Sequence, residues 1–388
     1  MDFHETPRLP AGFRCAARNC GLKTADPDLS VFVSDVPARA AALFTRNHFP
    51  GAPVVVGRER IRKGVLQAIV VNSKVSNVAT GPEGVEDALL MGRLGAGELG
   101  LQDELVLMSS TGLIGRRLPM EKIRLALVGV ANDLGRDPWP AARGIMTTDT
   151  EPKVLSLALG GGTLTAVGKG AGMIAPNLAT MLVFLFTDAE IETAALGPHL
   201  SAAAKESFQR LSVDTDTSTS DTVVLMANGL AGPVAAERFR EALTAICRRM
   251  AEWIARDGEG ATKLIRVTVD GAASDEDGDQ VARSVVDSPL VKTMAFGQDP
   301  NVGRVLMAIG KCFDCRITPD RVSARIQGVE VIRGGLGVPF VEAEVRELLG
   351  KDPVEISISL GVGDGRGIAF GCDLTEGYIR ENAAYASS

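Results

Sequence analysis

A threonine that follows a small residue and opens an apolar run is the chain's clearest candidate for covalent chemistry. Residues 169–186 read KGAGMIAPNLATMLVFLF, with Ala179 and Thr180 between the glycines and the apolar residues. A threonine hydroxyl is a weak nucleophile unless a base lies beside it. Cleavage of the Ala179–Thr180 bond by an N→O acyl shift would supply that base, because the freed α-amine has a pKa of about 7.7–8.0. The spacing alone also fits an ordinary threonine at the edge of a core strand.

The sequence offers few residues for other kinds of active site. The three histidines, His4, His48 and His199, are far apart in the sequence, so a Ser-His-Asp or Cys-His arrangement has few candidate bases. Cys312 and Cys315 form a C-x-x-C pair, but no second pair lies at a spacing that suits zinc. We therefore expect reduced cysteines, no metal and no cofactor.

The glycines that precede Thr180 do not indicate a nucleotide site. Residues 170–175 match the bare pattern G-x-G-x-x-A, but Pro176 and Asn177 prevent the helix that must follow such a loop. A P-loop is excluded as well, because Lys169 is followed by glycine and not by serine or threonine.

Composition indicates a globular protein of the size of an enzyme. The 388 residues are 45% hydrophobic and 23% charged, with a formal net charge of -7 and no basic run, so nucleic acid is not an expected partner. No apolar run reaches the roughly 18 residues of a membrane span, so no membrane association is expected. The N-terminus has no signal-peptide core, and we expect a cytoplasmic protein.

Strands and helices alternate irregularly along the chain, which predicts an α/β layered sandwich of sheets and helices in preference to a doubly wound sheet. The sharpest discontinuity is the loop at 168–179. Strands are predicted at 66–72, 104–110, 263–271, 321–332 and 354–361, with a hairpin at 154–170 and a further strand after Thr180. Helices are predicted at 82–94, 200–211, 235–257, 275–287 and 341–350.

Long motifs in a fixed order extend over nearly the whole chain. They include SSTGLIGRRLPMEKI (109–123), GIMTTDTEPK (144–153), KGAGMIAPNLATML (169–182), DTDTSTSDTVVLMANG (214–229), DGEGATKLI (257–265), SPLVKTMAFGQDPNVGRVLMAIG (288–310) and GCDLTEGYIRENAAYASS (371–388). This set closely resembles the ornithine acetyltransferase, or glutamate N-acetyltransferase, family of arginine biosynthesis. Phrases such as DTDTSTSDT are most similar to the ornithine acetyltransferases of clavulanic acid clusters.

The resemblance implies a self-cleaving N-terminal-nucleophile enzyme with the fold of the DmpA-type aminopeptidases. Cleavage between Ala179 and Thr180 would give an α chain of residues 1–179 and a β chain of residues 180–388. Thr180 would carry the acetyl group, while the Thr111 side chain and the Gly112 N–H would form the oxyanion hole. The cleaved chains are expected to assemble as an (αβ)₂ heterotetramer or a larger oligomer.

The same resemblance implies a set of residues that bind amino-acid substrates. A lysine can pair with an α-carboxylate, a glutamate with the ornithine ammonium, and short polar side chains can hold an amide. The residues at these family positions are Thr147, Lys169, Thr180, Glu259, Asn382 and Ser387.

Two segments depart from the family pattern. The family usually has Asn-Ser-Gly-Asn-Ala-Asn where this chain reads NSKVSNVATG (72–81), so the departure lies within Lys74–Asn77. It also has tryptophan in the D-P-N-W-G-R motif, where Val302 stands here. The departures leave the identity of the acyl donor and acceptor open, including any use of acetyl-CoA.

The expected reaction is ping-pong transfer of the acetyl group of N²-acetylornithine to L-glutamate through Thr180. Three alternatives stay open from the sequence. They are a related acyltransferase of specialised metabolism, an N-terminal-threonine amidase or aminopeptidase that uses water, and an uncleaved homologue that only binds.

Overall fold

The computed structural model describes residues 2–175 and 181–384. The chain divides into two compact units. The N-terminal unit comprises Met1–Gly170, Asn177–Gln209 and Thr217–Met250, and the C-terminal unit comprises Ala171–Pro176, Arg210–Asp216 and Ala251–Ser388. The chain first leaves the N-terminal unit after Gly170, inside the predicted discontinuity at 168–179.

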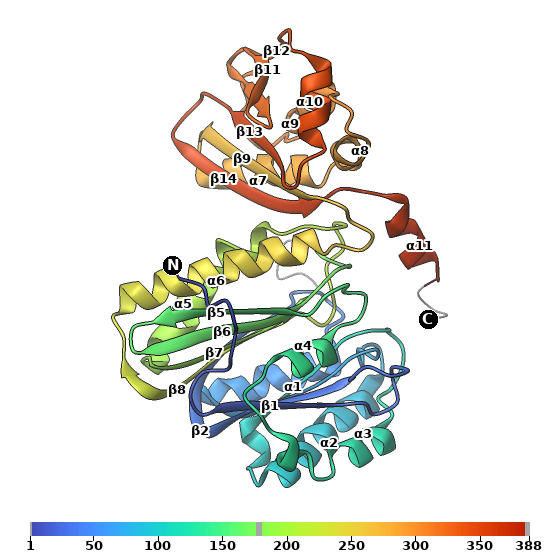
Figure 1. Cartoon of the computed structure of the whole chain (residues 1–388), viewed down its shortest axis with the longest axis vertical. Coiled ribbons are helices and arrows are strands. Elements are labelled where there is room, and N and C mark those ends of the chain that lie inside the picture. Colours follow the sequence, from blue (N-terminus) through green and yellow to red (C-terminus); the bar gives the residue numbers. More distant parts are fainter. Residues whose placement is uncertain (1, 176–180, 385–388) are drawn as a thin grey trace. The chain divides into compact units, whose positions relative to one another are not determined.

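The N-terminal unit is built on an eight-stranded mixed sheet in the order β4-β3-β2-β8-β7-β6-β5, with β1 paired to β2 (Figure 1). The strands are β1 (Phe13–Arg18), β2 (Leu29–Phe44), β3 (Val65–Asn72), β4 (Val106–Ser110), β5 (Lys153–Leu159), β6 (Gly162–Lys169), β7 (Leu182–Glu190) and β8 (Thr222–Pro233). The helices are α1 (Ala52–Arg60), α2 (Gly81–Leu99), α3 (Met120–Leu127), α4 (Trp139–Ile145), α5 (Thr193–Lys205) and α6 (Ala236–Arg256).

Helices cover both faces of this sheet, which explains why strands β3, β4 and β7 are buried and apolar along nearly their whole length. On one face Phe184 of β7 and Phe186 stack near Phe32 of β2, with ring centroids 5.5 and 5.2 Å away, and α4 packs over them. Helices α1, α2 and α3 cover alternate residues of β2, β3 and β4 on the opposite face. At Gly168 of β6 a Cβ would lie 2.7 Å from the sulfur of Met250, so α6 packs closely on this part of the sheet.

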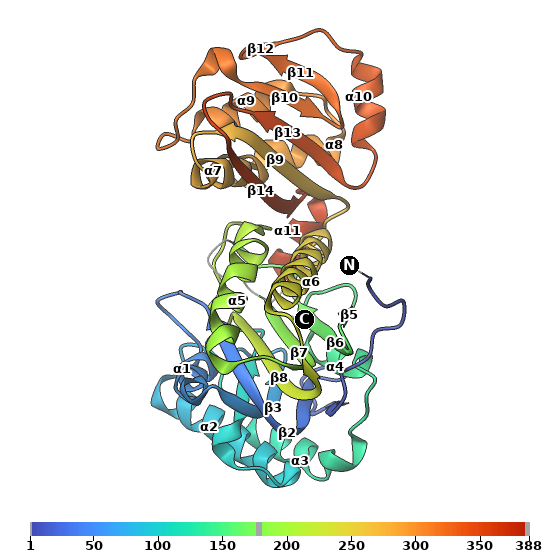
Figure 2. The ribbon, with the colours of Figure 1, turned by 90° about the vertical axis from the view of Figure 1, so that its left-hand side faces the viewer.

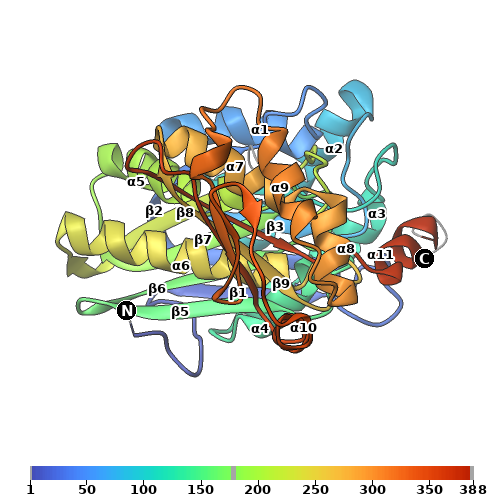
Figure 3. The same cartoon turned by 90° about the horizontal axis from the view of Figure 1, so that it is seen from above.

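The C-terminal unit is a six-stranded sheet in the order β12-β11-β10-β13-β9-β14 (Figure 2). Its strands are β9 (Leu264–Ala272), β10 (Ser323–Ile326), β11 (Val329–Arg333), β12 (Leu336–Gly337), β13 (Val354–Ser359) and β14 (Gly365–Cys372). Its helices are α7 (Asp275–Val286), α8 (Pro289–Gly297), α9 (Val302–Gly310), α10 (Glu342–Leu349) and α11 (Glu376–Ala384). Helices α7 to α10 share one apolar core with the sheet, and α7 and α9 lie side by side (Figure 3). Arg266 of β9 and Glu355 of β13 alternate with the core residues of their strands. Outside that core they form an ion pair, with 2.7 Å between Arg266 Nη1 and Glu355 Oε1.

Three strand ends meet in the N-terminal unit at the point where chemistry was predicted. Strands β6 and β7 are antiparallel, with Lys169 opposite Leu182, so the end of β6 lies beside the start of β7. Strands β7 and β8 are parallel, with Leu182 opposite Thr222, so the segment that enters β8 reaches the same edge. The first described residue after the predicted cleavage site, Met181, is buried at this edge.

The structure confirms most of the predicted elements and corrects two. The predicted helix at 200–211 is α5, which begins earlier at Thr193 and ends at Lys205, followed by a short 3-10 turn at Phe208–Arg210. The predicted single strand at 321–332 is the hairpin β10-β11, since Gln327 and Gly328 both adopt positive φ angles and reverse the chain. Within the described residues, no helix is long and apolar enough to cross a membrane.

Candidate active site

A buried lysine at the end of β6 gathers two of the predicted site threonines. The Lys169 side chain is 2% exposed, and its Nζ donates to Thr147 Oγ1 at 2.8 Å and to Thr111 Oγ1 at 3.5 Å. Thr147 follows α4 and Thr111 follows β4, so residues from three separate segments converge. The structure therefore brings together Thr111, Thr147 and Lys169, which sequence spacing alone does not place near one another.

The Asp149 carboxylate contacts several members of this cluster, and the sequence did not predict it as a site residue. Its fully buried carboxylate accepts hydrogen bonds from the Gly170 N–H at 2.6 Å and the Thr147 N–H at 3.0 Å, and lies 3.8 Å from Lys169 Nζ. It also pairs with the fully buried Lys153 at 2.9 Å. Burial alone would raise the pKa of Asp149, but the two ammonium groups and the Thr147 N–H hold it well below its usual range. The only sequence signal is an acid four residues before a lysine in TTDTEPK.

Thr111 and Gly112 present two adjacent polar groups at the end of β4. Gly112 adopts φ 129°, and a Cβ there would lie 2.2 Å from the backbone carbon of Lys74, so glycine is required. Within the described chain the Gly112 N–H has no hydrogen-bond acceptor, while the flanking Thr111 N–H and Leu113 N–H are bonded to Asn72 O and Lys74 O. A hydroxyl and an unbonded N–H side by side are the donors that a developing oxyanion needs.

The first departure from the family pattern, at Lys74–Asn77, contacts the segment that contains Thr111 and Gly112. Lys74 has φ 74° and Asn77 has φ 54°, the left-handed region that favours glycine or asparagine. Asn77 stabilises its own turn, because its Nδ2 donates to Gly84 O at 2.8 Å. Lys74 therefore holds a strained backbone where the family usually has glycine, directly against Gly112.

In the C-terminal unit the structure brings together Glu259 and Asn382. Asn382 Nδ2 donates to Glu259 Oε2 at 2.7 Å and to Tyr378 O at 3.0 Å. The Glu259 N–H donates to Ala171 O at 2.8 Å, and a Cβ at Gly172 would come within 2.2 Å of the Glu259 carboxyl carbon. Gly172 therefore packs closely against the Glu259 side chain. The second departure, Val302, is the half-buried first residue of α9 and packs on the core of this unit.

Ala179, Thr180 and Ser387 lie outside the described residues. The residue after the predicted nucleophile is described, and its partner is a second carboxyl that the sequence did not single out. The Met181 N–H donates to Asp221 Oδ1 at 3.1 Å, and the Asp221 residue is 1% exposed.

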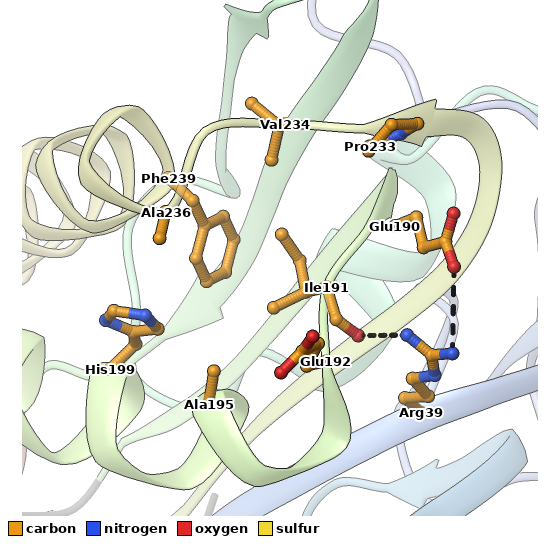
Figure 4. A pocket seen from close by; sticks show the side chains of 10 residues that line it. All are labelled: Arg39, Glu190, Ile191, Glu192, Ala195, His199, Pro233, Val234, Ala236 and Phe239. Carbon is orange, nitrogen blue, oxygen red and sulfur yellow. Dashed lines mark hydrogen bonds and ion pairs between the residues drawn. The ribbon is translucent and has the colours of Figure 1, made fainter.

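A pocket of about 350 Å³ lies at the opposite end of β7 (Figure 4). Arg39 closes one side by donating to Ile191 O at 2.6 Å, and the His199 ring contacts the edge of Phe239. Its ten lining residues include no serine, threonine or cysteine, so His199 has no nucleophile to activate there. Nine strand residues of roughly 3.3 Å each separate this pocket from the Lys169 cluster.

The predicted C-x-x-C pair consists of free thiols. Cys312 is buried against Ala308 O, and Cys315 lies 3.9 Å from Asp277 O. Burial raises the pKa of Cys315 to about 11, so its thiolate is scarce at neutral pH. No group of metal-ligating side chains is found in the described part of the chain.

The structure is thus an α/β sandwich with a buried lysine-threonine cluster at the sheet edge where β7 begins. Comparison with family models matches residues 14–387 to the ArgJ family, and the chain belongs to that family. This confirms the family that the motifs predicted.

Relatives match over their full length. "Arginine biosynthesis bifunctional protein ArgJ 2" of Nostoc sp. is 45% identical over 380 residues, 97% of this chain and 98% of that protein. "Glutamate N-acetyltransferase Oat2" of Streptomyces clavuligerus is 45% identical over 389 residues, 98% of this chain and 99% of that protein. The crystal structure of the arginine biosynthesis bifunctional protein argJ from Bacillus halodurans superposes with a TM-score of 0.52 at 44% identity, covering 53% of this chain and all of that one. The predicted fold class is thereby confirmed.

Proposed function

We propose that this protein is a glutamate N-acetyltransferase that takes its acetyl group from N²-acetylornithine through an acetyl-Thr180 intermediate. The observation that carries the proposal is the buried Lys169–Thr147–Thr111 cluster in a member of the ArgJ family. Lys169 lies opposite Leu182, two residues after Thr180, so the cluster adjoins the strand that Thr180 precedes.

Self-cleavage between Ala179 and Thr180 is part of the proposal. It would give chains of 179 and 388 − 179 = 209 residues. The solved Bacillus halodurans chain supports this, because its whole length is matched by 53% of this chain, close to 209 of 388 residues. We further propose that the cleaved chains assemble as (αβ)₂ or larger in the cytoplasm, which light scattering on the purified protein tests.

The proposed reaction proceeds in two half-reactions. Thr180 Oγ attacks the acetyl carbonyl while its α-amine takes the hydroxyl proton, and the oxyanion receives hydrogen bonds from the Thr111 hydroxyl and the Gly112 N–H. Collapse breaks the amide bond, and the departing ornithine amine receives the proton from the Thr180 ammonium. The glutamate amine then attacks acetyl-Thr180, loses its proton to the Thr180 amine and leaves as N-acetylglutamate, with the Thr180 hydroxyl restored.

Charge complementarity supports the proposed substrate contacts. The Lys169 ammonium and the Thr147 hydroxyl suit an α-carboxylate. Asp149 holds both residues in place, because its carboxylate accepts the Thr147 N–H and lies 3.8 Å from Lys169 Nζ. Glu259, oriented by Asn382, suits the side-chain ammonium of ornithine. Ser387 is proposed as a further contact on family resemblance alone.

Kinetics with paired donors and acceptors test the proposal. With N²-acetylornithine as donor and glutamate as acceptor, double-reciprocal plots should be parallel, and acetyl release to water should be slow. A Thr180→Ser variant, which keeps a hydroxyl, should retain activity that Thr180→Ala lacks. Turnover that needs no amine acceptor would contradict the transferase and favour the amidase alternative.

A further inference from the structure

The pocket of about 350 Å³ at the far end of β7 is built largely by two helices of the N-terminal unit (Figure 4). Glu192 at the N-cap of α5, Ala195 and His199 follow one another at intervals of three and four residues, so they line one side of that helix. Ala236 and Phe239 enter the pocket from the first turn of α6. The volume lies at the small end of the roughly 300–1,000 Å³ range of ligand pockets, which suits a small molecule.

Most of the pocket wall is apolar. Phe239 is fully buried, and its ring meets the ring of His199 edge-on with 5.6 Å between the centroids. The buried Ile191 and the half-buried Val234 complete this wall from the ends of β7 and β8. Such a wall favours a ligand with an apolar group, because moving that group out of water is favourable.

Glu192 adds a carboxylate that no described residue neutralises. An N-cap side chain commonly accepts an N–H of the first helical turn, yet Glu192 makes no such bond. Among residues 2–175 and 181–384 its side chain has no other hydrogen bond and no ion pair. The carboxylate is therefore available for a charge-assisted hydrogen bond from the ammonium group of a ligand.

Arg39 of β2 brings the opposite charge to the same part of the pocket. Its Nη1 donates to Ile191 O at 2.6 Å, and Ile191 directly precedes Glu192 in the chain. Its Nη2 lies 3.7 Å from Glu190 Oε1, which is too far for a hydrogen bond. A guanidinium has five N–H donors, so Arg39 keeps donors for a further acceptor, and a carboxylate is the acceptor that matches their geometry.

We propose that this pocket is a binding site for a free α-amino acid with an apolar side chain. The α-carboxylate binds Arg39, the α-ammonium binds Glu192, and the side chain lies against the apolar wall at Phe239. A zwitterion fits better than a simple cation or anion, because Arg39 and Glu192 are neighbours that do not pair with each other within the described structure. The site is separate from the proposed acetyl transfer, since the Lys169 cluster lies at the other end of β7.

Isothermal titration calorimetry of the purified wild-type protein with L-phenylalanine tests the ligand class. We expect one molecule bound per 388-residue sequence with a Kd of about 1 mM or tighter. Phenethylamine lacks the carboxylate and 3-phenylpropionate lacks the ammonium, so each should bind at least about tenfold more weakly. L-Lysine keeps both α-groups but has a charged side chain, and it should also bind at least about tenfold more weakly.

Two variants test the location. Glu192→Gln keeps the size of the side chain and removes its charge, so L-phenylalanine should bind at least about tenfold more weakly. Ala195→Leu fills the pocket with another good helix former and should abolish binding in a folded protein, as checked by thermal unfolding. The matched control is Glu104→Gln, an exposed glutamate in the turn before β4, which should bind like wild type. All three variants should transfer acetyl at the wild-type rate.

The titrations can overturn the inference in three ways. Absence of binding at about 10 mM L-phenylalanine would show that the pocket takes no amino acid. Equal affinity for phenethylamine, 3-phenylpropionate or L-lysine would refute the apolar zwitterion as the ligand. Wild-type affinity in both Glu192→Gln and Ala195→Leu would place the bound amino acid elsewhere on the protein.

Discussion

Replacing Asp149 by asparagine is the perturbation whose size the structure best defines. The carboxylate is fully buried, bonded to Lys153 at 2.9 Å and to two backbone N–H groups. Removing one partner of a buried ion pair typically costs about 3–5 kcal/mol. We expect Asp149→Asn to lower the free energy of unfolding by that amount, measured by urea denaturation at pH 7.

The pH dependence of that loss gives an independent check. The pKa of Asp149 is depressed in the folded protein, so its contribution is present above the unfolded pKa of about 3.9 and declines as pH falls below it. The difference between wild type and Asp149→Asn should therefore be constant from pH 6 to 8 and shrink in acid.

A double-mutant cycle identifies the partner. Asp149→Asn combined with Lys153→Met should cost clearly less than the sum of the single variants, because the buried ammonium is removed with its counter-ion. The matched control is Glu121→Gln, which breaks an exposed pair with Arg124 and should leave stability unchanged. Additive effects in the cycle, or a change in Asp149→Asn below about 1 kcal/mol, would refute the reasoning.

Four further outcomes are expected. Thr111→Ala should lower kcat and kcat/KM together by about 10²–10³-fold, and a raised KM with normal kcat would show that Thr111 only binds substrate. Lys74→Gly should raise the free energy of unfolding by about 1 kcal/mol in chemical denaturation by relieving the positive φ, and a loss would argue against strain. Asp221→Asn should flatten the decline in stability as pH rises above about 4, since a raised native pKa makes the folded state bind more protons; unaltered curves would speak against a neutral Asp221. Deleting residues 382–388 should spare self-cleavage and impair acetyl transfer, assayed on the same preparation, whereas normal transfer would make the tail dispensable.

The sequence predicted many of the apolar elements, although not the central strand β8, and it predicted the polar geometry poorly. Strand β2 was missed because Pro37 interrupts its pattern, and the structure accommodates it with a register shift between Val33 and Ala38. Asp149 and Asp221 stand among threonines and serines, a composition typical of turns and caps. Only the fold reveals that both are buried beside the start of β7.

The threonine-lysine cluster shows a second limit of prediction from the sequence. Thr111 and Thr147 precede Lys169 by 58 and 22 residues along the chain, and no periodicity connects them. Their membership of one site came from resemblance to a family, and the structure supplies the physical reason in converging strand ends. The oxyanion role of Gly112 and the substrate roles of Glu259 and Asn382 stay predictions.

Mass spectrometry of the purified protein after incubation with N²-acetylornithine alone tests the central claim most directly. The proposal predicts two fragments of 179 and 209 residues, the second beginning Thr-Met-Leu-Val and carrying one acetyl group on the Thr180 hydroxyl. Addition of glutamate should remove that group as N-acetylglutamate. A single chain of 388 residues, or a cleaved protein that turns over without ever carrying acetyl on Thr180, would contradict the account.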